Sequence, residues 1–122
     1  MAFCLLLVGC SQAEEKISEE LQKKVLELHD VLMPKTEQIV SLKSKLDSLS
    51  TGADSTHVRK LISSLDKADK SMMDWMHQFS IDSLEKMDVG NKVIYLKNQY
   101  TQLTDLQKLT DSTLNAAQKY RP

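Results

Sequence analysis

Apolar residues recur at alternating spacings of four and three along the first half of the chain, from Leu21 to Leu49. This spacing places them on one stripe of an α-helix that packs against partner helices. Pro34 lies within the stripe, yet the pattern continues on both sides of it, which predicts one long helix over residues 14–49 with a bend at Pro34 instead of a loop. The stripe consists of Leu21, Val25, Leu28, Leu32, Ile39, Leu42, Leu46 and Leu49, and Lys35 is its interruption.

The same spacing of apolar residues predicts two further helices. Gly52 and Asp54 supply a helix stop and a helix N-cap, which predicts a tight turn before a second helix over residues 55–79. Residues 80–91 are polar apart from a short helical turn around Leu84 and Met87, and a third helix is expected over residues 90–119. Short connections make neighbouring helices antiparallel, so the sequence predicts an all-α, antiparallel, up-down-up three-helix bundle with a kinked long first helix. The residues expected to face inward are Val58, Leu61, Leu65, Ala68, Met72, Trp75 and Phe79 in the second helix, with Ile62 and Met76 beside them, and Val93, Leu96, Tyr100, Leu103, Leu106, Leu114 and Ala117 in the third.

Composition agrees with this fold and narrows the possible functions. The 122 residues suit a single domain, and because aromatic residues make up only 5%, the core must come mainly from Leu, Ile, Val and Met. The formal net charge is -1, and both signs are mixed along the chain, so no basic stripe indicates nucleic-acid binding.

The N-terminus predicts export and lipidation. Residues 2–9 form an apolar run of eight, long enough for a signal peptide but short of the roughly 20 residues of a membrane-spanning helix. Residues 7–10, Leu-Val-Gly-Cys, resemble the lipobox of bacterial lipoproteins, which implies a diacylglyceryl group on the Cys10 thiol and cleavage before that residue. No Lys or Arg precedes the run, which indicates a start codon further upstream. The alternative is that residues 1–9 are a frayed apolar end of the chain.

These features divide the chain into a signal peptide (residues 1–9), a lipidated cysteine with a short tether (residues 10–13) and a bundle (residues 14–122). We expect the lipid to hold the bundle at a membrane of the cell envelope. Ser11 is not the Asp of inner-membrane retention signals, which favours the outer membrane, and the Glu14-Glu15 pair weakly resembles surface-export signals, so the leaflet stays open. With Cys4 removed and Cys10 modified, no disulfide is expected.

A layer of histidine and methionine residues is the candidate metal site. Folding the first hairpin about residues 52 and 53 brings His29 level with Met76, beside Met33, Met73 and His77. Thioether and imidazole ligands suit Cu(I), so His29, Met33, Met73 and His77 form the candidate ligand set. The helical phase places His29 next to the apolar stripe, however, and turns Met33, Met73 and His77 further away from it. The four side chains would therefore not converge on one metal ion without distortion. The favoured interpretation is therefore a core methionine layer with half-exposed histidines, and no cofactor is predicted.

The aromatic pair Trp75 and Phe79 has two interpretations. It could form an exposed docking patch for a protein partner, in which case Trp75 should be partly exposed, or it could belong to the core, which its spacing favours. The sequence contains no Gly-rich phosphate loop and no G-x-S-x-G, H-E-x-x-H or C-x-x-C motif, so we expect no enzyme activity and propose no catalytic residues.

Two segments carry a resemblance to a known family. His29-Asp30-Val31-Leu32-Met33-Pro34-Lys35 and Ala68-Asp69-Lys70-Ser71-Met72-Met73-Asp74-Trp75-Met76-His77-Gln78-Phe79 resemble uncharacterised lipoproteins of Bacteroidetes that are often labelled viral A-type inclusion protein-like. The resemblance covers the first two helices well and the third loosely, and this chain has Val31 and Thr36 where the family has an acidic residue and a second Met. It implies an envelope location and a helical fold, and no activity.

Three functional hypotheses follow from these patterns. The first is a non-enzymatic envelope lipoprotein whose bundle serves as an interaction or scaffold module for a protein partner at the membrane surface. The second is a periplasmic copper-binding or other metal-binding lipoprotein that uses the His/Met layer. The third is self-association through the apolar stripe as a longer coiled coil, so the oligomeric state stays open.

Overall fold

The computed structural model describes residues 2–52 and 54–121, with side chains from residue 12 onward. The elements are α1 (Ala2–Asp47), α2 (Ser55–Gln78), the short α3 (Ile81–Glu85) and α4 (Val89–Lys119), and the described residues form no strand. The predicted all-α fold is therefore confirmed, including the short helical turn around Leu84. The predicted signal peptide, residues 1–9, and the Cys10 thiol lie outside the residues whose side chains are described.

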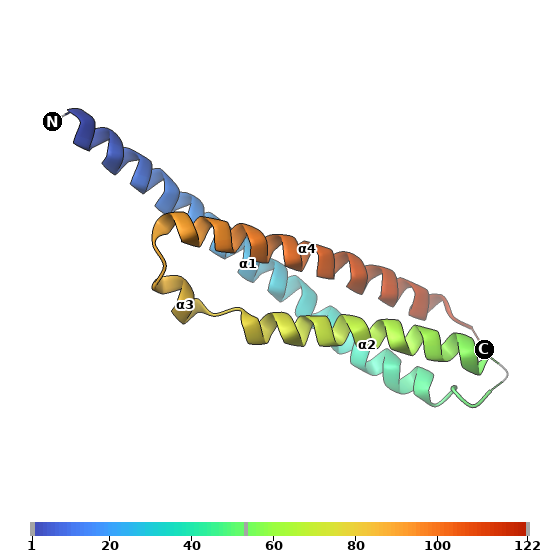
Figure 1. Cartoon of the computed structure of the whole chain (residues 1–122). Helices are drawn as coiled ribbons and strands as arrows, with labels where there is room; N and C mark the ends of the chain where they lie inside the picture. The colour runs from blue at the N-terminus through green and yellow to red at the C-terminus, as the bar shows by residue number, and fades with distance from the viewer. Residues whose placement is uncertain (1, 53, 122) are drawn as a thin grey trace.

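The three long helices pack against one another in every pairing. The chain reverses after α1 and again at α3, so α2 runs antiparallel to α1 and α4 returns in the direction of α1 (Figure 1). This is the predicted up-down-up bundle. Within the part of the chain that the structure describes, no helix combines the length and the apolar character needed to cross a membrane.

The buried face of α1 repeats every seven residues. Val25, Leu32, Ile39 and Leu46 are almost completely buried, and Ser18 extends the same column by one heptad. The other members of the predicted stripe, such as Leu28 and Leu42, are half-buried at its edge. The repeat is that of helices packing side by side in coiled-coil fashion.

In α4 the prediction of the inward face is partly wrong. Tyr100 is exposed and Val93 is half-buried, whereas three polar residues, Gln99, Thr110 and Thr113, are buried. The cause is the packing register of α4, which buries columns seven residues apart without regard to polarity. Tyr100 lies beside these columns and is 37% exposed.

The two irregular positions of α1 are both accommodated. The helix continues through Pro34, as predicted, while the bend itself stays a prediction. Lys35, which interrupts the apolar stripe, places its Nζ 2.6 Å from Asp111 Oδ1 of α4. An ion pair thus takes the place of an apolar contact at this level.

The helix ends use polar side chains as caps. The Ser80 hydroxyl accepts a hydrogen bond from the Ser83 N–H at the start of α3, and Asp88 accepts one from the Asn91 N–H at the start of α4. Asp54 occupies the predicted N-cap of α2 but makes no capping hydrogen bond. Its carboxylate instead accepts from the Tyr120 hydroxyl at 3.3 Å, and burial together with this carboxylate raises the pKa of Tyr120.

The core divides along the bundle into two clusters. The α3-end cluster comprises Val25, Leu32, Met72, Trp75, Leu84, Leu96, Leu103 and Leu106. The turn-end cluster comprises Ile39, Leu46, Val58, Leu61, Leu65, Ala68, Leu114 and Ala117. Leu109 is half-buried and packs against both clusters, so it links them through α4.

Candidate partner-binding groove

Trp75 belongs to the core. Its side chain is 6% exposed, and its ring stacks on Phe79 with centroids 4.9 Å apart. The stack continues to Tyr95 of α4 at 6.0 Å from Phe79, and His29 of α1 lies 5.7 Å from Trp75 on another side. Because Trp75 is buried and Phe79 is half-buried, this pair is not an exposed docking patch, and the core interpretation of Trp75 holds.

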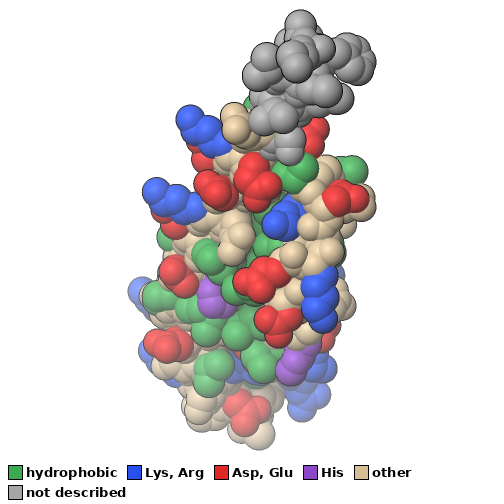
Figure 2. All heavy atoms as spheres, turned by 90° about the vertical axis from the view of Figure 1, so that its left-hand side faces the viewer, with side chains coloured by type: hydrophobic (Ala, Val, Ile, Leu, Met, Phe, Trp, Pro, Cys, Tyr) green, Lys and Arg blue, Asp and Glu red, His purple; other side chains and the backbone are tan. Residues whose placement is uncertain are grey.

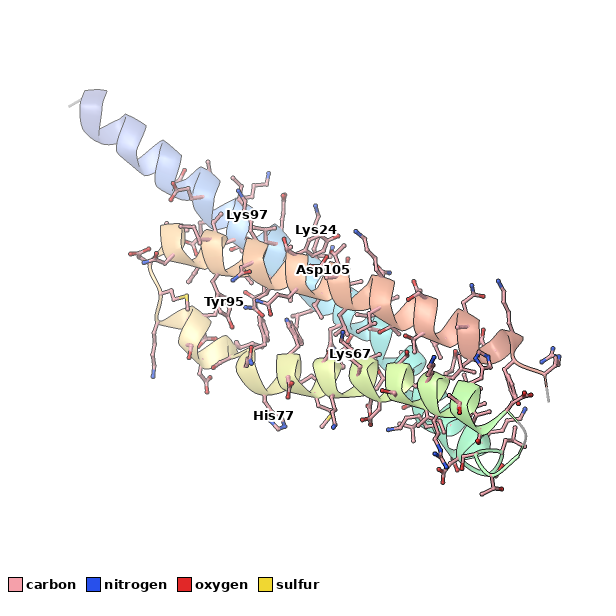
Figure 3. All side chains as sticks on the ribbon, turned by 45° about the vertical axis from the view of Figure 1, so that its right-hand side comes forward. Lys24, Lys67, His77, Tyr95, Lys97 and Asp105 are labelled. Atoms are coloured by element: carbon pink, nitrogen blue, oxygen red, sulfur yellow. The ribbon has the colours of Figure 1, made fainter. Side chains whose placement is uncertain are left out.

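The four candidate metal ligands have different surroundings. His29 lies against Trp75, with its Nδ1 3.3 Å from Asp30 Oδ1, and Met33 packs against the α3-end cluster. Met73 and His77 are exposed on α2, and Figure 3 shows His77 pointing away from the bundle. No group of three or more His, Cys, Asp or Glu side chains within metal-binding reach occurs among the described residues. The Cu(I) site stays a prediction that no observed contact favours.

The exposed apolar side chains gather toward the α3 end of the molecule. In the described part of residues 41–72 and 101–121 no large hydrophobic side chain is exposed, whereas Ile17, Leu26, Ile81 and Ile94 are exposed toward the α3 end. Val40, next to Ile39 of the turn-end cluster, is an exposed residue outside this group. Figure 2, which looks onto the left-hand end of Figure 1, shows hydrophobic side chains between acidic and basic ones on that surface. The α3 end of the bundle therefore exposes more large apolar side chains than the turn end.

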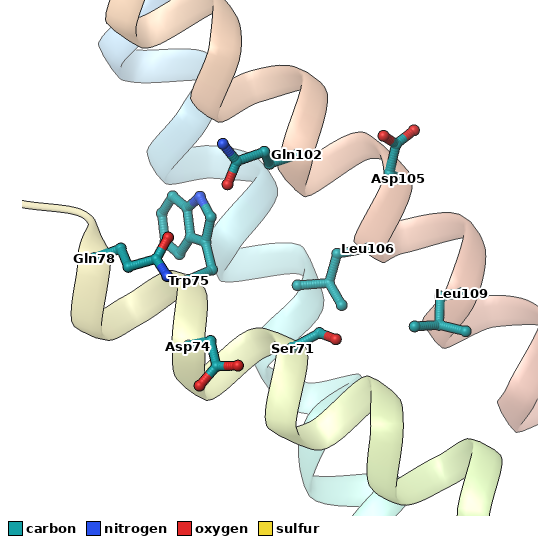
Figure 4. A pocket seen from close by; sticks show the side chains of 8 residues that line it. All are labelled: Ser71, Asp74, Trp75, Gln78, Gln102, Asp105, Leu106 and Leu109. Carbon is teal, nitrogen blue, oxygen red and sulfur yellow. The ribbon is translucent and has the colours of Figure 1, made fainter.

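A groove between α2 and α4 is the concave feature nearest to Trp75. It encloses about 350 Å³ and is shown in Figure 4. Trp75, Leu106 and Leu109 form its apolar floor. Its polar lining consists of Ser71, Asp74 and Gln78 from α2 and Gln102 and Asp105 from α4. We call this feature the α2–α4 groove.

The amides of the groove reach toward its centre. In Figure 4 the side chains of Gln78 and Gln102 extend from the two helices toward each other on either side of the Trp75 ring. Each amide carries both hydrogen-bond donors and an acceptor. The Nε1–H of Trp75, which is also buried in this wall, has no hydrogen-bond partner among the described residues.

The carboxylates of the groove differ from those of Asp66, Asp69 and Asp111, which form ion pairs with lysines. Asp66 lies 2.7 Å from Lys43 and 3.4 Å from Lys70, and its hydrogen bond to Lys43 lowers the pKa of its carboxyl group. Asp74 and Asp105 form no ion pair with any described residue. The groove is therefore flanked by negative charge that the bundle itself does not neutralise.

The groove was not predicted from the sequence. Ser71, Asp74 and Gln78 lie three and four residues apart, and Gln102 and Asp105 lie three apart, so each set occupies one helix face. In the sequence, a polar face of this kind looks like any solvent-exposed helix face until the two helices are placed together. The one sequence signal for the groove was that both polar faces lie directly beside the buried apolar columns of α2 and α4.

Comparison of the chain with protein-family models, with curated proteins and with solved structures gave no match. The resemblance of the first two helices to Bacteroidetes lipoproteins stays a prediction.

Proposed function

We propose that this chain is a non-enzymatic, lipid-anchored protein of a bacterial cell envelope, and that its bundle binds a protein partner through the α2–α4 groove. The observation that carries the proposal is the groove itself. It combines an apolar floor with the carboxylates of Asp74 and Asp105, which form no ion pair with a described residue. It also presents two amides, of which that of Gln102 donates to Asn98 Oδ1 at 3.4 Å and keeps its oxygen available as an acceptor. Such a combination of an apolar centre and a polar rim is common at protein interfaces.

The chemistry of the groove indicates a basic segment as its occupant. Asp74 and Asp105 attract a Lys or Arg side chain, and charge-assisted hydrogen bonds are among the stronger polar contacts. The amides of Gln78 and Gln102 can accept from and donate to a peptide backbone. The aliphatic stem of the basic residue would cover Leu106 and Leu109.

The proposed location depends on Cys10. Two acyl chains on this residue suffice for stable membrane attachment, since each buried methylene contributes about 0.8 kcal/mol. The exposed apolar side chains toward the α3 end, among them Ile17 and Ile94, support a position of this end close to the lipid surface. We propose the outer membrane, with the leaflet open.

Photo-crosslinking in intact bacteria tests the groove. A photoreactive residue at Gln78 should give a discrete crosslink to one partner, and one at Glu37, on the exposed side of α1, should not. The charge reversal Asp105→Lys should abolish the Gln78 crosslink, while Asp82→Lys on the exposed surface of α3 should leave it intact. Equal crosslinking from Gln78 and Glu37, or a crosslink that survives Asp105→Lys, would contradict the proposal.

Metabolic labelling with an alkyne fatty acid tests the anchor, and the chain supplies its own control. Cys10→Ser should lose the label and leave the membrane fraction, whereas Cys4→Ser, in the predicted signal peptide, should keep both. If Cys10→Ser retained the label, Cys10 would not be the site of lipidation.

A further inference from the structure

A second cavity lies at the opposite end of the bundle from α3, and its lining differs from that of the α2–α4 groove. It encloses about 530 Å³ between the end of α1 and the end of α4. Its walls are mainly apolar, formed by Leu42, Leu46, Leu49 and Ala117 together with Tyr120. This size and character match cavities that hold small ligands, which are mostly apolar with a few placed polar groups.

The charged side chains that line this cavity, among the described residues, are all of one sign. Lys45 and Arg121 line it, and no acidic residue does among those that the structure describes. Neither forms an ion pair with a described carboxylate; Arg121 donates only to the Gln118 and Tyr120 carbonyl oxygens, at 3.3 Å each. A cation near a helix C-terminus also stabilises the helix dipole, so Lys45 alone would not indicate a ligand. The apolar cavity below the two cations is the independent observation.

The Tyr120 side chain, which forms one wall of this cavity, contacts residues at the start of α2. The Tyr120 hydroxyl donates to Asp54 Oδ2 at 3.3 Å, and its ring lies 5.6 Å from that of His57. These contacts fix the aromatic wall, so the cavity does not depend on a freely rotating side chain.

From these observations we infer that this cavity binds a single-chain alkyl carboxylate, a fatty acid. The alkyl chain lies against the leucines, where burial of its methylene groups supplies the affinity. The carboxylate lies at the mouth, where Lys45 and Arg121 supply the complementary charge. The inference is independent of the α2–α4 groove, because no residue lines both cavities.

Titration of the full chain with three amphiphiles of equal chain length tests the inference, with NMR chemical shifts and calorimetry as readouts. Dodecanoate should bind and perturb Leu42, Leu49, Ala117 and Tyr120. Dodecylamine should bind more weakly because its headgroup repels the two cations, and dodecanol should lie between them. Equal binding of all three, perturbations confined to other surfaces, or no binding of dodecanoate would overturn the inference.

Substitution of Lys45 and Arg121 tests how much their charge contributes to dodecanoate binding without disturbing the fold. The double variant Lys45→Gln/Arg121→Gln changes only exposed or edge side chains and should weaken dodecanoate binding about tenfold or more, with dodecanol binding unchanged. Lys67→Gln/Lys97→Gln removes the same charge from exposed positions that line neither cavity and should bind dodecanoate like the parent chain. An equal loss in both double variants would reduce the effect to net charge and would overturn the inference.

Discussion

At the scale of single residues, the bundle separates aspartates with a structural role from aspartates that are free to bind. Asp66 joins α2 to Lys43 of α1, whereas Asp74 of the same helix forms no ion pair with a described residue. Lys43 also lies 3.8 Å from Asp69, so one lysine serves two carboxylates. Asp66 and Asp74, both on α2, therefore form a matched pair of positions for substitution, one with an ion pair and one without.

We expect Asp66→Asn to lower stability slightly at neutral pH, because exposed ion pairs contribute little. Since the hydrogen bond to Lys43 lowers the pKa of Asp66 below its ordinary value of 3.8, folding favours the charged form. Its stabilisation is complete above that value and is lost as pH falls through the lower pKa of the folded state. Urea unfolding should therefore show a difference at neutral pH that disappears in acid.

Asp74→Asn is the control for this experiment. It should match the parent chain at both pH values, because Asp74 forms no ion pair among the described residues. A pH-independent deficit in Asp66→Asn would show that its effect is not ionic.

Two neighbouring residues of α1, one buried and one exposed, test which face of this helix belongs to the core. Leu32 is fully buried in the α3-end cluster, and Val31, one residue before it, is 51% exposed. Leu32→Ala should lower the free energy of unfolding by about 2–5 kcal/mol, because it leaves a cavity. Val31→Ala should change it by less than about 0.5 kcal/mol. Denaturant melts of both variants check the assignment of the buried face, and comparable losses would contradict it.

At the scale of helices, periodicity predicted the buried faces of α1 and α2 better than that of α4. In α2 the exception is Met76, which was expected in the core beside Met72 but is 40% exposed, because it lies to one side of the buried column. In α1 and α2 the buried columns are almost wholly apolar, so spacing alone identifies them. In α4 the columns contain Gln99, Thr110 and Thr113, and an apolar pattern passes over such residues. The burial of these groups is imposed by α1 and α2, which is tertiary information that no single helix carries.

The same distinction applies to the sites. The sequence placed His29 level with Met76 across the first hairpin, and in the structure the His29 ring lies 5.7 Å from that of Trp75, the residue before Met76. It could not identify the α2–α4 groove or the cavity near Tyr120, because each is formed by side chains of two helices that are far apart in sequence. Both depend on the relative rotation of the helices, which periodicity does not determine.

The ion pair between Lys35 and Asp111 should help to set the register of α1 against α4. It lies at the break in the apolar stripe, with Nζ and Oδ1 2.6 Å apart. Lys35→Asp should destabilise the bundle by placing two carboxylates together, and adding Asp111→Lys should recover part of that loss. A double-mutant cycle should give a coupling of about 0.2–1 kcal/mol. Additive effects would mean that the pair contributes nothing to the pairing of these helices.

At the scale of the whole molecule, the division of the core into two clusters bears on how the two proposed sites communicate. The α2–α4 groove has Trp75 of the α3-end cluster in its floor, and the cavity near Tyr120 is lined by Leu46 and Ala117 of the turn-end cluster. Leu109 lines the groove and packs against both clusters. Any coupling between the two ends would therefore be expected to pass through this residue.

Leu109→Ala should weaken the coupling between the two core clusters more than it destabilises either cluster alone. We expect a loss of about 2 kcal/mol, at the lower end of the range for leucine truncation because Leu109 is only half-buried. Trp75 is the only tryptophan of the chain, so its fluorescence reports the α3-end cluster alone, while circular dichroism reports all the helices. In the parent chain the two unfolding transitions should coincide, as for a cooperative small domain. In Leu109→Ala they should separate, because each cluster then unfolds with less support from the other; coincident transitions in the variant would show that the helices themselves, and not Leu109, make the bundle one cooperative unit.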